Sequence, residues 1–166
     1  MDPDSYIGQL RAVVGPRRLL MPGVRLVLMR EDGAVLLQLR TDFRRWGLPG
    51  GTPEEGESLE ACVVREAKEE LDVELGELLP FGFSSDPSLE TVQFPNGDCC
   101  QYFAMMFACP KFNGTPRIAD DESLDLRWCT EDELPEPLMA ATRPTLGAFQ
   151  AWEESRHFQL LQFGSR

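Results

Sequence analysis

Three glutamates in the middle of the chain, Glu66, Glu69 and Glu70, are spaced so that a helix places them along one edge. With about 100° of rotation per residue they fall within an arc of roughly 100°, and the apolar residues Val63 and Ala67 occupy the adjoining arc. Carboxylates so close together repel one another unless a counter-charge lies between them. Either they bind a divalent cation such as Mg²⁺, which takes oxygen ligands, or they form a solvated acidic face.

The residues around this triplet favour the cation. Gly51, Glu57 and Arg65 complete the pattern G-x5-E-x7-R-E-x-x-E-E, which directly follows Leu48-Pro49-Gly50. Six identities at fixed spacing are far more specific than a lone glycine motif. Through this box the chain resembles the Nudix hydrolase family, and the order of its elements is similar to that of a MutT-like Nudix domain.

Two residues depart from the family pattern. Ala67 stands where a bulky aliphatic residue is usual, and Asp72 replaces the glycine that ends the helix in a left-handed conformation. Asp is among the better tolerated non-glycine residues at such a position. We therefore expect these departures to affect packing and helix termination rather than chemistry.

The resemblance implies a metal-dependent enzyme that hydrolyses a phosphoanhydride (pyrophosphate) bond in a small nucleotide-like substrate, a nucleoside diphosphate joined to a group X. The candidates are nucleotide sugars, ADP-ribose, dinucleotides and nucleoside triphosphates. Its cofactor would be Mg²⁺ or Mn²⁺, which offsets the phosphate charge that repels an attacking water. Two alternatives stay open: a sensor module that binds a nucleotide or metal without cleaving it, and a structural module that binds a partner.

Carried over by position, the resemblance assigns roles to the box residues. Glu69 and Glu70 are implied metal ligands, and Glu66 is either another ligand or the general base. Arg65 is expected to orient a glutamate rather than touch substrate. The implied set of metal-binding residues is Gly50, Glu57, Glu66, Glu69 and Glu70, with Glu57 either stabilising the junction of loop and helix or reaching a second metal.

Residues outside the box supply further candidates. Glu122, in the acidic run Asp120-Asp121-Glu122, is a candidate catalytic base or ligand, or else a solvated loop charge. Arg40 and Arg44 flank the loop into the box and are candidates for binding substrate phosphates, or else surface charges. Three aromatic residues are candidates for stacking on a base, with core packing as the favoured alternative: Trp46, Phe83 and Phe94.

Length and composition limit the other possibilities. The 166 residues fit a single domain, 1–166, with residues 1–21 as an N-terminal helical extension. A net charge of −12 disfavours binding to nucleic acid through a broad basic surface. Five cysteines without C-x-x-C spacing and a single histidine favour reduced thiols in a cytoplasmic protein, and no signal peptide or membrane anchor is expected. A two-fold homodimer is the default expectation for assembly.

The predicted fold is α/β (α+β). The resemblance implies a Nudix-type α/β/α sandwich with a mixed, mainly antiparallel curved sheet and a catalytic loop and helix. The first two strands are expected to form an antiparallel hairpin around Glu31-Asp32-Gly33. From periodicity and turn signals we predict helices over 6–14, 58–71 and 144–157, strands over 24–29, 34–39, 78–83, 91–94, 99–109 and 124–128, a loop over 40–52 and a helical turn over 130–134.

Overall fold

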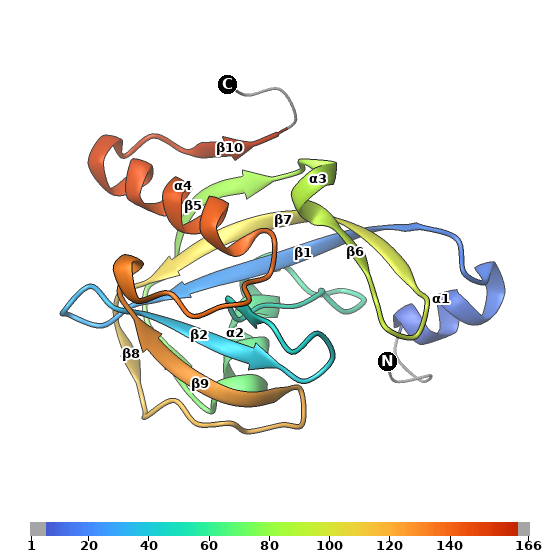
Figure 1. Cartoon of the computed structure of the whole chain (residues 1–166), viewed down its shortest axis with the longest axis horizontal. Coiled ribbons are helices and arrows are strands. Elements are labelled where there is room, and N and C mark those ends of the chain that lie inside the picture. The colour runs from blue at the N-terminus through green and yellow to red at the C-terminus, as the bar shows by residue number, and fades with distance from the viewer. Residues whose placement is uncertain (1–5, 163–166) are drawn as a thin grey trace.

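The computed structural model describes residues 6–162, and it has a sheet between two helical layers (Figure 1). Helix α2 (Leu59–Leu71) covers one face and helix α4 (Thr142–Ser155) the other. Alternating side chains of one strand reach both layers, because successive residues of a strand point to opposite faces. Leu26 and Leu28 belong to the apolar cluster that includes α2, whereas Val27 belongs to the cluster that includes α4. The predicted three-layer α/β fold is confirmed.

The main sheet is mixed, as predicted. Its long central strand, β7 (Cys99–Cys109), runs parallel to β1 (Leu19–Leu28) on one side and antiparallel to β5 (Leu79–Ser84) on the other. Strand β10 (Gln159–Leu161) extends the sheet parallel to β5, and β6 (Thr91–Gln93) forms a hairpin with the start of β7. An Asn96-Gly97 turn joins β6 to β7, with Gly97 at φ 93°.

Two smaller sheets complete the fold. Strand β2 (Val35–Arg40) pairs antiparallel with both β3 (Trp46–Gly47) and β9 (Ser123–Cys129). Strands β4 (Glu74–Leu75) and β8 (Phe112–Asn113) form a two-stranded sheet. Strand β3 lies inside the segment 40–52, which was predicted to be loop throughout.

The prediction that the first two strands form a hairpin is wrong. A turn is present, but β1 and β2 share only one bridge, between Met29 and Val35, and then enter different sheets. The reason is that another segment uses the backbone donors of β1. The carbonyl of Pro49 accepts from the Leu26 amide at 2.8 Å, and that of Gly51 accepts from the Val24 amide at 2.9 Å.

The remaining helical segments are short. Helix α1 (Tyr6–Val14) has the predicted bounds, and α4 is shifted towards the N-terminus by two residues relative to its prediction. The turn predicted after β9 is the 3-10 helix η1 (Glu131–Glu133), but the Thr130 side chain does not cap it. Helix α3 (Pro87–Glu90), β4, β8 and β10 were not predicted.

Helix α2, which carries the glutamates, has well-defined ends. The Ser58 hydroxyl accepts from the Ala61 amide at 3.1 Å and caps its start. Asp72 closes it in the left-handed conformation, with φ 54° and ψ 40°. Its carboxylate pairs with Lys68 at 2.5 Å and with Arg117 at 2.7 Å, so two cations favour the residue that replaces the usual glycine.

Candidate active site

The glycine-rich loop before α2 is fixed against β1. Between the two carbonyls bonded to β1, Gly50 has φ 151°, and a Cβ there would overlap the backbone oxygen of Val24. Its amide turns towards α2 and donates to Glu70 Oε2 at 3.2 Å. At Gly51, a Cβ would overlap the carboxylate of Glu66. The loop can therefore lie against two of the glutamates only because both positions lack a side chain.

Glu70 is the most enclosed of the three glutamates, with 2% of its surface exposed. Gln38 of β2 donates from Nε2 to Glu70 Oε1 at 3.1 Å, and Ser123 of β9 donates to Gln38 Oε1 at 3.1 Å. Burial raises the pKa of Glu70 to about 8, although the bonds from Gln38 and Gly50 oppose the rise. Three elements thus hold this carboxylate in one orientation.

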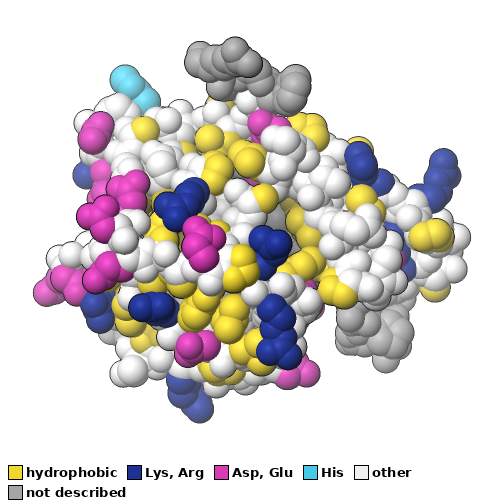
Figure 2. Space-filling view, viewed as in Figure 1, with side chains coloured by type: hydrophobic (Ala, Val, Ile, Leu, Met, Phe, Trp, Pro, Cys, Tyr) yellow, Lys and Arg dark blue, Asp and Glu magenta, His cyan; other side chains and the backbone are white. Residues whose placement is uncertain are grey.

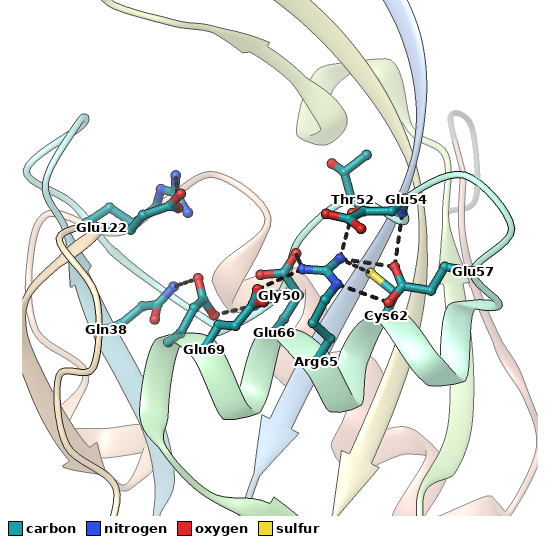
Figure 3. A network of polar contacts seen from close by, with 12 residues as sticks. Gln38, Gly50, Thr52, Glu54, Glu57, Cys62, Arg65, Glu66, Glu69 and Glu122 are labelled. Carbon is teal, nitrogen blue, oxygen red and sulfur yellow. Dashed lines mark hydrogen bonds and ion pairs between the residues drawn. The ribbon is translucent and has the colours of Figure 1, made fainter. Parts of the chain in front are cut away.

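Arg65 is the centre of a second polar network (Figure 3). Its Nε and Nη2 each donate to Glu57 at 3.0 Å, and its Nη1 donates to Glu66 at 3.0 Å and to Glu69 at 2.9 Å. These bonds raise the pKa of Arg65, the pair with Glu57 most of all, so the guanidinium stays charged. Burial raises the pKa of Glu66, and Arg65 limits that rise.

These two networks separate the carboxylates. Among residues 6–162, no three carboxylate, imidazole or thiol groups converge on a point where a cation could sit. In Figure 3, Arg65 bonds both Glu66 and Glu69. Glu70 instead bonds Gln38 and Gly50. The donor set still suits Mg²⁺ or Mn²⁺, because it consists of carboxylate oxygens beside a backbone turn and contains no thiolate or imidazole.

The edge of α2 that carries Glu66 and Glu69 borders a cleft of about 1610 Å³, called the cleft from here on. Glu66, Glu69 and both loop glycines line it, as do Arg40 and Glu122 from the facing loops. Arg40 bonds Asp42 through Nε and Nη2, at 3.0 and 2.9 Å, and its Nη2 lies 3.8 Å from Glu122. On one side, the walls of the cleft come from α1, β1, α3 and the β6–β7 hairpin. The other walls come from the loop 40–55, the edge of α2, and residues 120–122 and 139–142.

Several sequence candidates lie elsewhere. Glu57 does not line the cleft; it joins the loop to α2 through Arg65 and the Glu54 amide. Arg44 is exposed and does not line the cleft, whereas its neighbour Arg45 does. Trp46 is buried in the core cluster below α4, in agreement with the core-packing alternative.

A NUDIX domain model matches residues 19–149. The chain belongs to the Nudix family. The nucleoside triphosphatase NudI of Escherichia coli O139:H28 (strain E24377A / ETEC) is 33% identical over 127 residues, which cover 72% of this chain and 89% of NudI. The structure of a MutT NUDIX hydrolase from Burkholderia pseudomallei is similar with a TM-score of 0.64 and 31% identity, covering 78% of this chain and 97% of that one. An ADP-ribose pyrophosphatase from Streptococcus suis 89-1591 shares the fold, with a TM-score of 0.61 and 22% identity. The match covers 86% of this chain and 98% of that one.

Nudix proteins are pyrophosphohydrolases, and this chain is a Nudix hydrolase. The box pattern therefore identified the family correctly. The face shown in Figure 2 agrees with the acidic composition: Lys and Arg side chains are scattered among Asp and Glu and form no continuous basic patch there. In the described part of this Nudix chain, no helix is long and apolar enough to cross a membrane.

Sequence reasoning missed two polar groups of this Nudix domain. Gln38 is fully buried, and its signal was a lone amide in the apolar run Val35–Leu39, which indicates a buried partner. The second is the ion pair between Arg25 and the buried Glu90, with bonds of 3.1 and 2.9 Å, which also receives a hydrogen bond from Ser84. Nothing local indicated it, because the two charges are 65 residues apart.

Proposed function

We propose that this Nudix hydrolase cleaves a pyrophosphate bond in nucleoside triphosphates, using Mg²⁺ or Mn²⁺ held at the glutamate edge of α2. The observation that carries the proposal is that Glu66 and Glu69 line the cleft along α2, with the buried Glu70 directly behind the cleft-lining Gly50 and accepting from its amide. NudI, which is 33% identical to this chain, is named as a nucleoside triphosphatase, and this favours triphosphates over other nucleoside diphosphate-X compounds.

Glu69 and Glu70 are the proposed cation ligands, with the Gly50 carbonyl beside them. The chemistry that a bound cation supplies is neutralisation of phosphate charge and a lowered pKa of water. Arg65 would give up its bond to Glu69 when that carboxylate holds the cation, and it would keep its bond to Glu66 Oε1 and its two bonds to Glu57. We assign to Arg65 and Glu57 the role of positioning the carboxylates.

Glu66 is the proposed proton acceptor. It is partly enclosed, burial raises its pKa, and Arg65 bonds only its Oε1. Its Oε2 would take the proton from the attacking water. Glu122, on the facing loop and 59% exposed, adds negative charge opposite Glu66 and is the proposed second acid.

Arg40 is the proposed phosphate-binding residue. Asp42 occupies its Nε and Nη2, so the guanidinium is oriented before substrate arrives while Nη1 is not used by that pair. A fixed guanidinium suits bidentate or single contacts to phosphate oxygens. Arg44 has no such orientation and is not assigned to the substrate.

A product-resolved substrate screen tests the proposed function. Purified protein with Mg²⁺ or Mn²⁺ is given ribo- and deoxyribonucleoside triphosphates, ADP-ribose, a nucleotide sugar and a dinucleotide, and the products are separated by ion-exchange chromatography. We expect nucleoside monophosphate and pyrophosphate from at least one triphosphate. Turnover of ADP-ribose alone would contradict the triphosphate assignment, and metal-dependent binding without turnover would favour a sensor.

The buried Glu70 predicts a pH dependence of stability. Its pKa is about 8 in the folded protein against 4.5 for an ordinary Glu, so between these values the folded state binds more protons than the unfolded state. Stability therefore falls as pH rises from 4.5 towards 8 in protein without added metal. Glu70→Gln removes an ionisable group of the same shape and should flatten this decline, whereas Glu60→Gln, exposed on the same helix, should not. Urea unfolding at several pH values in this interval measures the free energy of unfolding of the wild type and both variants. If this free energy changes with pH to the same extent in all three proteins, the prediction is refuted.

A further inference from the structure

The cleft continues from the glutamate edge to the N-terminal helix α1. Tyr6, Ile7 and Leu10 of α1 line it, together with Met21 and Tyr102 of the main sheet. Small-molecule sites usually have about 300–1,000 Å³, so a cleft of 1610 Å³ has room for more than a phosphate chain. Helix α1 precedes residues 19–149, so this end of the cleft is built partly by a segment outside the matched domain.

Arg11 links α1 to the rest of the fold. Arg11 donates to the carbonyls of Cys99 and Gly15, at 2.7 and 3.1 Å, and its Nε lies 3.2 Å from a carboxylate oxygen of Asp98. These contacts join α1 to the β6–β7 hairpin, beside which it lies in Figure 1. No residue of α1 is fully buried, and Ile7 and Leu10 are partly exposed.

The surfaces beyond the glutamates are aromatic. Phe43 and Phe94 also line the cleft, with ring centroids 5.3 Å apart and planes at 49°. The ring of Tyr102 packs over Gly23, where a Cβ would come within 3.3 Å of it. Aromatic and apolar faces stack on planar groups. The Arg40 guanidinium lies 5.8 Å from the centroid of the Phe43 ring, so the aromatic residues adjoin the proposed phosphate-binding residue, while the glutamates line the cleft along α2.

We propose that Ile7 and Leu10 of α1, with Tyr102 and the Phe43–Phe94 pair, form the subsite that binds the nucleobase of the substrate. This inference rests on the proposed function. It adds that the site recognises the nucleobase of the substrate through these residues. The phosphate chain lies towards Glu66 and Glu69, and the base lies towards α1. Substrate choice then depends on a helix that precedes the matched Nudix domain.

The test is a double substitution with a control on the same helix. Ile7→Ser/Leu10→Ser changes the cleft side of α1, and Val13→Ser changes a residue that is 86% exposed and does not line the cleft. Because the double variant loses the apolar contact of both side chains with the base, we expect it to raise KM for the triphosphate about 10-fold. The inhibition constant of the free nucleoside should rise equally, while kcat and inhibition by inorganic tripolyphosphate should stay within about twofold. Val13→Ser should match the wild type throughout.

The outcomes separate this subsite from the proposed function. The fold should survive because no residue of α1 is buried, and melting temperatures verify it, with Phe94→Ala as a second variant. If the wild type hydrolyses triphosphates and the double variant keeps its KM, the subsite is wrong and the proposed function stands. If the wild type hydrolyses none, the proposed function fails, and calorimetric binding of the nucleoside still decides the subsite: weakened binding in the double variant alone supports it, and equal binding overturns it.

Discussion

The double substitution Glu69→Gln/Glu70→Gln is expected to lower kcat for triphosphate hydrolysis by about 10³-fold or more. Amide side chains keep the size of the carboxylates but remove the two charges that would hold a cation, and loss of one well-placed electrostatic contact already costs about 10²–10³ in kcat. Binding of Mg²⁺ or Mn²⁺, measured by calorimetry, should weaken in parallel. Steady-state kinetics at saturating metal give the main measurement.

Two comparisons make this result specific. Glu60→Gln changes another acid on α2 that does not line the cleft, and it should leave kcat within about twofold of the wild type. The double variant should remain folded at neutral pH, because Glu70, with a pKa of about 8, is already mostly uncharged there in protein without metal; melting temperatures verify this. Wild-type turnover in a folded double variant would remove these glutamates from the chemistry.

Gly50→Ala is expected to lower both the free energy of unfolding and kcat, with the second largest effect of the substitutions considered. The new Cβ would overlap the carbonyl oxygen of Val24, a backbone atom that cannot rotate away, at a φ of 151°. We expect a loss of about 3 kcal/mol in the free energy of unfolding. Because the Gly50 amide bonds Glu70, the displaced loop should also lower kcat in whatever fraction remains folded.

Gly147→Ala is the matched control. Gly147 lies inside α4, and a Cβ there would meet no atom within 4 Å. Alanine favours a helix over glycine, so this variant should be more stable by about 0.5–1 kcal/mol with unchanged kinetics. Denaturant titrations of both variants provide the comparison. A Gly50→Ala protein as stable and active as the wild type would contradict the loop geometry described here.

The features that could be predicted from the sequence are those that depend on residues close together in the chain. The bounds of α1 and β7, the start of α2 at Ser58, and the common edge of Glu66, Glu69 and Glu70 all follow from periodicity, capping and fixed helical spacing. The family pattern added the loop that precedes the helix. These features need no information about distant residues, which is why they could be stated in advance.

What the sequence did not predict depends on partners far along the chain. The expected hairpin failed because the carbonyls of Pro49 and Gly51 use the donors of β1, more than twenty residues away. Likewise Arg25 contacts Glu90 across 65 residues of sequence, and Arg11 contacts Cys99 across 88. Periodicity indicates whether a residue is buried or exposed, but not which residue it contacts. The bond from Gln38 to Glu70 and the lining of the cleft by α1 were therefore found only in the structure.

The most direct test of the account is a crystal structure of the protein with Mn²⁺ and a non-hydrolysable triphosphate, using the anomalous signal of the metal. We predict an ion bound by oxygens of Glu69 and Glu70 together with phosphate oxygens, and Arg65 bonded to Glu57 but no longer to Glu69. A bound nucleotide with no ion at α2, and with Arg65 still bonded to Glu69, would contradict the proposed site.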